Sequence, residues 1–157
     1  RIDLYQLHTI DPKVPLEDSL GALVDAQRAG KIRHIGVSNF NVKQLERARK
    51  VATIVSVQNR YSLADRSSDD VLAHCEKLGI AFLPWYPLGA GGTLKMARVK
   101  KIADKLSATP AQVSIAWLLA KSPVMLPIPG TSRIAHLEEN VAAARLKLSR
   151  EDFAALD

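Results

Sequence analysis

Short apolar runs alternate with longer amphipathic stretches from one end of this chain to the other. Each run is rich in Ile, Val and Leu and has the length of a strand, whereas the stretches between the runs repeat their apolar residues at helical spacing. Strand, helix and strand in repeated order indicate right-handed crossovers and a parallel sheet. The expected strands are residues 2–7, 32–37, 54–57, 80–84 and 124–128.

Start and stop signals mark the helices between these strands. Pro15 opens the first helix and Gly30 closes it, which is the usual placement of these two residue types. Thr109-Pro110-Ala111-Gln112 is a capping box with proline in the first turn, and it divides two consecutive helices. The remaining expected helices are about 42–51, from Ser67 or Ser68 to Gly79, about 135–144, and a short terminal helix capped by Ser149.

This order of elements fits an α/β protein with one domain spanning residues 1–157. Five βα units suit either an open doubly wound sheet or an incomplete (β/α)₈ TIM barrel, whose complete form needs about 250 residues. Periodicity alone does not choose between the two. The chain begins on a strand at Arg1 without a methionine, and we expect this start to be a cut edge.

Composition narrows the functional classes. Hydrophobic residues make up 47% and charged residues 24%, as in soluble globular proteins, and no apolar run approaches the length of a membrane span. The net charge is +6, but cations and acids are interleaved along the helices, so we expect no nucleic-acid partner. The single cysteine, Cys75, fits a reducing cytoplasm. His34 and His74 lack partners at metal-ligand spacing, so we expect no metal site.

Polar residues follow the first three expected strands. His8 ends the first strand, where it could polarise a substrate oxygen or simply be a satisfied, partly buried histidine. Ser38 and Asn39 follow the second, where they could bind an amide group or form an Asx turn that caps the next helix. Gln58 follows the third and supplies another amide at the same level. In a parallel α/β protein, chemistry gathers at this end of the strands.

Two later segments have the composition of a cofactor site. Trp85 and Tyr86 precede a Gly-rich loop, so their rings could stack on a flat heterocycle while the loop amides face phosphate; alternatively, Trp85 packs at the rim of the barrel. Leu94 stands where a dinucleotide fingerprint needs its third glycine, so the loop is not that motif. After the last expected strand, hydroxyls and Arg133 precede a helix and favour phosphate binding.

Together these segments resemble the aldo-keto reductase family over the whole chain, and weakly its bacterial pyridoxal-reductase-like branch. The resemblance selects the incomplete barrel, from the fourth strand through the eighth helix, with the first three strands missing. The matching segments are Asp3-Leu4-Tyr5-Gln6-Leu7-His8, Gly36-Val37-Ser38-Asn39-Phe40, Val57-Gln58-Asn59, Pro87-Leu88-Gly89 and Ile128-Pro129-Gly130-Thr131-Ser132, with Glu139-Asn140 after them.

The resemblance implies a role for each matching residue, with NADP(H) as the cofactor. His8 would orient the substrate carbonyl, and Trp85 would take the place of the ring, usually tyrosine, that stacks on the nicotinamide; Tyr86 stands where many members have serine. Gly130 replaces a common lysine of the loop that grips the 2′-phosphate. The other implied cofactor contacts are Ser38, Asn39 and Gln58 for the carboxamide, Leu88, Gly89, Ala90 and Gly91 for the pyrophosphate, Thr131, Ser132 and Arg133 for the 2′-phosphate, and His136, Glu139 and Asn140 for the adenine.

The family's proton donor is a tyrosine supported by a lysine and an aspartate, and Tyr5, Tyr61 and Tyr86 do not stand in that motif. We therefore expect a parent protein that reduces small aldehydes or ketones with NADPH, while this chain alone is inactive. One alternative is a non-catalytic NADP(H)-binding or regulatory protein of the same fold. Another is a half-barrel that assembles as a dimer. A truncated barrel leaves sheet edges unpaired, so we expect the isolated chain to self-associate.

Overall fold

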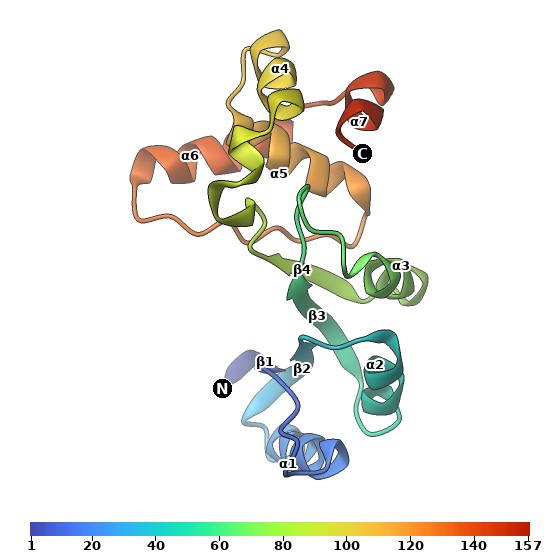
Figure 1. The fold of residues 1–157 in the computed structure, drawn as a ribbon. Coiled ribbons are helices and arrows are strands. Elements are labelled where there is room, and N and C mark those ends of the chain that lie inside the picture. Colours follow the sequence, from blue (N-terminus) through green and yellow to red (C-terminus); the bar gives the residue numbers. More distant parts are fainter. The chain divides into compact units, whose positions relative to one another are not determined.

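Four strands form the sheet of this chain, which a computed structural model describes from Arg1 to Asp157 (Figure 1). Their order is β1-β2-β3-β4, and β1 pairs with β2, and β2 with β3, in parallel. The chain divides into two compact units, residues 1–59 with 68–83 and residues 60–67 with 84–157. The first unit holds β1 (Ile2–Leu7), α1 (Leu16–Arg28), β2 (Ile32–Ser38), α2 (Val42–Arg49), most of β3 (Ile54–Arg60), α3 (Asp69–Leu78) and the start of β4 (Ala81–Trp85).

The predicted strand and helix signals of the first unit are confirmed at most boundaries. Pro15 stands immediately before α1, and α3 ends at Gly79, whose φ of 65° is the left-handed conformation that glycine adopts readily. The N-cap of α2 is Asn41, which forms a capping box with Gln44. The expectation that Asn39 caps this helix is therefore wrong, because the cap lies two residues further on.

The core of the first unit lies between the sheet and its three helices. The strands contribute side chains with no exposed surface, and Leu20 of α1 and Leu45 of α2 cover them. Cys75 of α3 is fully buried as expected, and burial raises the pKa of its thiol to about 12. The fully buried strand residues are Ile35, Val37, Val57 and Phe82.

Glycine at position 36 allows a contact between strands that are not neighbours. Gly36 lies in β2, and a Cβ built on it would collide with the Ser56 side chain on β3 and crowd Gln6 on β1. In its absence the Gln6 side-chain amide donates to Ser56 Oγ at 3.1 Å. This bond ties β1 to β3 across the middle strand.

The second unit is helical and is built around Trp117. This residue of α5 has no exposed surface and stacks with Tyr61 and Phe153, with 6.1 Å between ring centroids in each pair. Thr109 and Gln112 form the predicted capping box of α5, and Ser149 caps the terminal helix as expected. The elements are η1 (Gly89–Gly91), η2 (Thr93–Lys95), α4 (Ala97–Lys105), α5 (Pro110–Lys121), α6 (Ile134–Ala142), η3 (Ala143–Arg145) and α7 (Arg150–Leu156).

The fifth predicted strand, residues 124–128, is wrong. Val124 lies in a turn, and residues 126–130 have no regular secondary structure. Pro127 and Pro129 have no N–H group, so this segment cannot offer a run of donors to a neighbouring strand. The chain therefore contains four strands and an extended segment that leads into α6. No helix combines the length and the apolar composition that crossing a membrane requires.

Candidate functional site

The carboxyl ends of β1, β2 and β3 bring four of the predicted residues together in the first unit. We call His8, Ser38, Asn39 and Gln58 the strand-end cluster. The Ser38 hydroxyl donates to the Gln58 carbonyl oxygen at 2.7 Å, and the Asn39 side-chain amide donates to the His8 carbonyl oxygen at 3.0 Å and to Ser38 Oγ at 3.2 Å. The backbone N–H of Asn39 also donates to the Gln58 carbonyl oxygen at 3.0 Å. Three strand ends are thereby joined by hydrogen bonds.

Asn39 reaches these partners because its backbone leaves the strand conformation. Its φ of 61° is in the left-handed region, which asparagine enters more readily than other residues with a side chain. The turn swings the carboxamide back toward His8 and Ser38. This geometry explains why asparagine, and not a bulkier amide, stands at this position.

Two side chains of the strand-end cluster remain available to a ligand. His8 is exposed and its ring has no hydrogen-bond partner within the chain, so the interpretation of His8 as a satisfied, partly buried histidine is wrong. Gln58 is half-buried, and its carboxamide makes no hydrogen bond within the chain. Neighbouring Asn59 is different, because its side chain bonds both the N–H and the carbonyl oxygen of Phe40, at 3.1 and 2.7 Å, and has a structural role.

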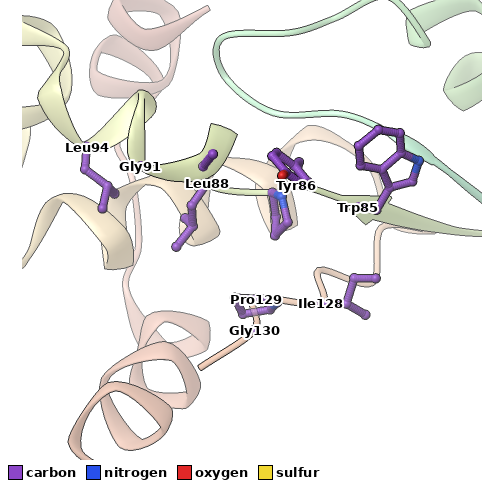
Figure 2. A pocket seen from close by; sticks show the side chains of 10 residues that line it. Trp85, Tyr86, Leu88, Gly91, Leu94, Ile128, Pro129 and Gly130 are labelled. Atoms are coloured by element: carbon purple, nitrogen blue, oxygen red, sulfur yellow. The ribbon is translucent and has the colours of Figure 1, made fainter. Parts of the chain in front are cut away.

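Two adjoining cavities in the second unit hold most of the other predicted residues. The first has a volume of about 500 Å³, and Figure 2 shows its walls. The second has a volume of about 230 Å³ and shares Leu88, Leu94 and Gly130 with the first, so we call the two the paired cavities. The first is lined by Trp85, Tyr86, Pro87, Leu88, Ala90, Gly91, Leu94, Ile128, Pro129 and Gly130, and the second by Leu88, Leu94, Thr109, Pro110, Ala111, Gly130, Thr131, His136, Glu139 and Asn140.

The loop between β4 and η2 has an unusual backbone. Tyr86, Gly89, Ala90 and Gly91 all have positive φ, at 58°, 55°, 51° and 84°. Where a residue near the right-handed region precedes one with positive φ, as Leu88 precedes Gly89, consecutive amide groups turn toward one side and can form an anion-binding concavity. The amides of Gly89, Gly91 and Gly92 close turns within the loop, whereas those of Leu88 and Ala90 have no acceptor within the chain. The loop thus offers two amide donors, fewer than its glycine content suggests.

Of the predicted site residues just before α6, Thr131 lines a cavity, whereas Ser132 and Arg133 do not. Thr131 lines the second cavity, and its hydroxyl oxygen accepts from the Arg133 N–H at 3.1 Å. Ser132 and Arg133 are exposed and line neither cavity, and no side chain caps α6. Gly89 also lies outside the lining of both. Arg133 is therefore an exposed cation at the start of α6, and it is not part of a cavity wall.

Several lining residues were not foreseen as site residues. Leu94 and Ile128 are apolar walls with no polar group that would mark them, and Pro129 lies in the segment that was expected to be a strand. Thr109, Pro110 and Ala111 contribute the start of α5 to the second cavity. The capping box is the signal that could have found them, because it marks a helix N-terminus. No group of three or more His, Cys, Asp or Glu side chains is placed to hold a metal ion.

Known proteins resemble this chain over all or most of its length. The profile of the Aldo/keto reductase family matches residues 1–157. An uncharacterized oxidoreductase of Schizosaccharomyces pombe is 47% identical over 158 residues, covering 100% of this chain and 52% of that protein. Pyridoxine 4-dehydrogenase of Escherichia coli is 48% identical over 145 residues, covering 90% of this chain and 50% of that protein.

A solved structure agrees with the fold. The aldo-keto reductase of Klebsiella pneumoniae, crystallised in complex with NADPH, superposes with a TM-score of 0.90 at 29% identity and covers 99% of this chain and 57% of its own. The chain thus spans about half the length of the curated relatives it matches. The α/β fold with parallel strands is that of an incomplete (β/α)₈ barrel, as the motif resemblance implied.

Proposed function

Because this chain belongs to the aldo/keto reductase family, we propose that it supplies the cofactor-binding part of an NADP(H)-dependent oxidoreductase that reduces small aldehydes and ketones. The observation that carries the proposal is the pair of adjoining cavities. Ten of the expected cofactor contacts line these two cavities. The proposal extends to the cytoplasm as the location, on the ground of a single buried cysteine.

The residues of the paired cavities fit a dinucleotide. Aromatic rings and apolar side chains wall the first cavity, which suits a nicotinamide ring, and the unpaired amides of Leu88 and Ala90 suit phosphate oxygens. The second cavity combines apolar walls with His136, Glu139 and Asn140, which suits an adenosine end. In this proposal Thr131, Ser132 and Arg133 bind the 2′-phosphate.

The strand-end cluster has a complementary part in the proposal. The available carboxamide of Gln58, together with Ser38 and Asn39, would hold the nicotinamide carboxamide, and the exposed His8 would orient the substrate carbonyl. The reduced nicotinamide supplies hydride to the carbonyl carbon when it is bound. The carbonyl oxygen would then take a proton from a group that is not assigned on this chain, because Tyr5, Tyr61 and Tyr86 do not stand in the family's proton-donor motif.

Pyridoxal is a first substrate to test, because pyridoxine 4-dehydrogenase is among the similar proteins. The full-length protein should oxidise NADPH in the presence of pyridoxal or small aldehydes, as followed by the loss of NADPH absorbance. NADPH binding without turnover on any aldehyde would support the regulatory alternative instead. Failure to bind NADPH would refute both.

We also propose that residues 1–157 alone self-associate. β1 forms one edge of the sheet, and its residues Ile2, Leu4 and Tyr5 are 49%, 38% and 42% exposed. Exposed apolar strand edges pair readily with other strands. Light scattering of the 157-residue chain should give a mass above 17.2 kDa, and a stable monomer would contradict this proposal.

A further inference from the structure

Arg60, the last residue of β3, lies against the two aromatic side chains of the first cavity. Its guanidinium carbon is 5.6 Å from the ring centroid of Trp85 and 5.8 Å from that of Tyr86. The two rings meet edge to face, with 5.3 Å between centroids and an interplanar angle of 89°. Arg60 itself does not line the cavity. It therefore contacts the wall of the cavity from outside.

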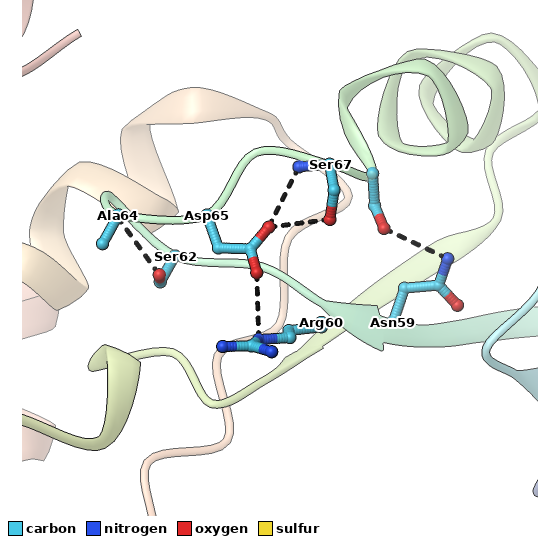
Figure 3. A network of polar contacts seen from close by, with 7 residues as sticks. Asn59, Arg60, Ser62, Ala64, Asp65 and Ser67 are labelled. Atoms are coloured by element: carbon cyan, nitrogen blue, oxygen red, sulfur yellow. Dashed lines mark hydrogen bonds and ion pairs between the residues drawn. The ribbon is translucent and has the colours of Figure 1, made fainter. Parts of the chain in front are cut away.

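Asp65 fixes the guanidinium in this position, as Figure 3 shows. Its carboxylate accepts from Arg60 Nε at 2.9 Å and from the Ser67 N–H and hydroxyl at 3.1 and 2.7 Å. The backbones of Ser62 and Asp65 exchange two further hydrogen bonds, at 2.9 and 3.1 Å, which close the turn between them. Arg60 thus bonds one oxygen of a carboxylate whose other oxygen, Oδ1, accepts both hydrogen bonds from Ser67.

The aromatic wall needs such support. Tyr86 has a φ of 58°, which is strained for a bulky residue, and the residue is 51% exposed. A strained backbone conformation persists only where the surrounding structure holds it in place. A guanidinium contacts aromatic faces favourably by cation–π attraction, and here one guanidinium lies within 6 Å of the centroids of two rings.

We propose that Arg60 is a positioning residue that holds Trp85 and Tyr86 in the orientation in which they receive the nicotinamide ring. This inference rests on the proposed NADP(H) function. It predicts that Arg60 contributes to binding of the nicotinamide end of the cofactor and contributes nothing to binding of the adenosine end, which the second cavity takes.

The test uses the full-length protein and two ligands. NADPH carries the nicotinamide ring, whereas adenosine 2′,5′-bisphosphate carries only the adenosine end. In Arg60→Met the Kd for NADPH should rise about two- to fivefold, the equivalent of one lost cation–π contact. The Kd for adenosine 2′,5′-bisphosphate should not change, and this second measurement also shows that the variant is folded. Both constants are measured by isothermal titration calorimetry.

Arg66→Met is the matched control. Arg66 lies over the Trp117 ring at 4.7 Å and is bound by Asp157 at 2.8 Å, so it repeats the Arg60 arrangement at a ring that lines neither of the paired cavities. Its NADPH affinity should equal that of the wild type. Unchanged NADPH affinity in Arg60→Met, an equal loss for both ligands, or an equal loss in Arg66→Met would each overturn the inference. If the wild-type protein binds neither ligand, the proposed NADP(H) function itself is refuted. This outcome differs from those that would overturn only the role of Arg60.

Discussion

The strand-end cluster and the paired cavities position their residues by different physical means. In the cluster, the backbone ladder of β1, β2 and β3 sets the spacing, and hydrogen bonds of 2.7 to 3.2 Å join the strand ends. In the paired cavities, loops with positive φ and helix starts supply the walls, and Ser132 and Arg133 remain exposed. The first arrangement is fixed before a ligand arrives, whereas part of the second is free to adjust to one. This difference predicts that equivalent substitutions in the two regions have unequal costs.

Glycine substitutions should show the largest difference. Gly36 lies in β2, one of the strands that carry the strand-end cluster. Gly36→Val places a side chain where Ser56 and Gln6 already lie, and overpacking between strands should cost about 3 kcal/mol of unfolding free energy. Gly130→Val lies in the wall of both cavities, where a Cβ meets no atom within 4 Å, and should change stability by less than about 0.5 kcal/mol. Urea denaturation of the full-length protein without cofactor measures both. Equal losses would mean that the two regions are equally rigid.

Asparagine substitutions should show a smaller difference in the same direction. Asn59 lies in β3, beside the cluster residue Gln58. Asn59→Ala removes both partners of the buried Phe40 backbone groups and should cost about 1–2 kcal/mol of unfolding free energy. Asn140→Ala removes a half-buried side chain of the second cavity that makes no hydrogen bond within the chain, so stability should stay within about 0.5 kcal/mol. The same urea series compares them. A larger loss of unfolding free energy for Asn140→Ala than for Asn59→Ala would mean that the cavity wall is the more rigid of the two regions.

The smallest expected effect is the loss of unfolding free energy at acid pH that results from protonation of Asp65. Hydrogen bonds from Ser67, and the nearby Arg60 guanidinium, hold the pKa of Asp65 below its ordinary value of 3.8. A lowered pKa stabilises the fold at neutral pH, and this contribution is lost as the pH falls below about 4. Because Arg60 is largely exposed, solvent screening limits the contribution to less than about 1 kcal/mol. Asp65→Asn should therefore flatten the decline in unfolding free energy between pH 5 and pH 3, whereas an unchanged slope would exclude Asp65 as its source.

The elements that were predicted well are those whose signals are local. Pro15, Gly79 and the Thr109–Gln112 pair act within one turn of their own helix, so their residue types are sufficient evidence. The segment 124–128 has the apolar composition of a strand, but a strand also needs donors, and Pro127 and Pro129 remove them. In this segment the apolar composition predicts a strand, whereas the missing N–H groups disfavour one. The missing donors determine the structure.

The same distinction applies to the candidate site. His8, Ser38, Asn39 and Gln58 could be foreseen because strand ends in a parallel sheet lie at one edge. The contact of Arg60 with Trp85 joins residues from different strands, and nothing in the local sequence around either residue indicates it. The exclusion of Ser132 and Arg133 from the cavity lining is likewise a property of the loop path, which residue types do not specify.

The enclosure of Trp117 has a practical use. The chain contains only two tryptophans, and Trp117 has no exposed surface and no partner for its indole N–H, whereas Trp85 is half-buried in a cavity wall. An indole in a dry aromatic stack emits at shorter wavelength than one in contact with water. The blue side of the emission spectrum therefore reports unfolding and the red side reports cavity occupancy, so that one unlabelled sample can record both transitions.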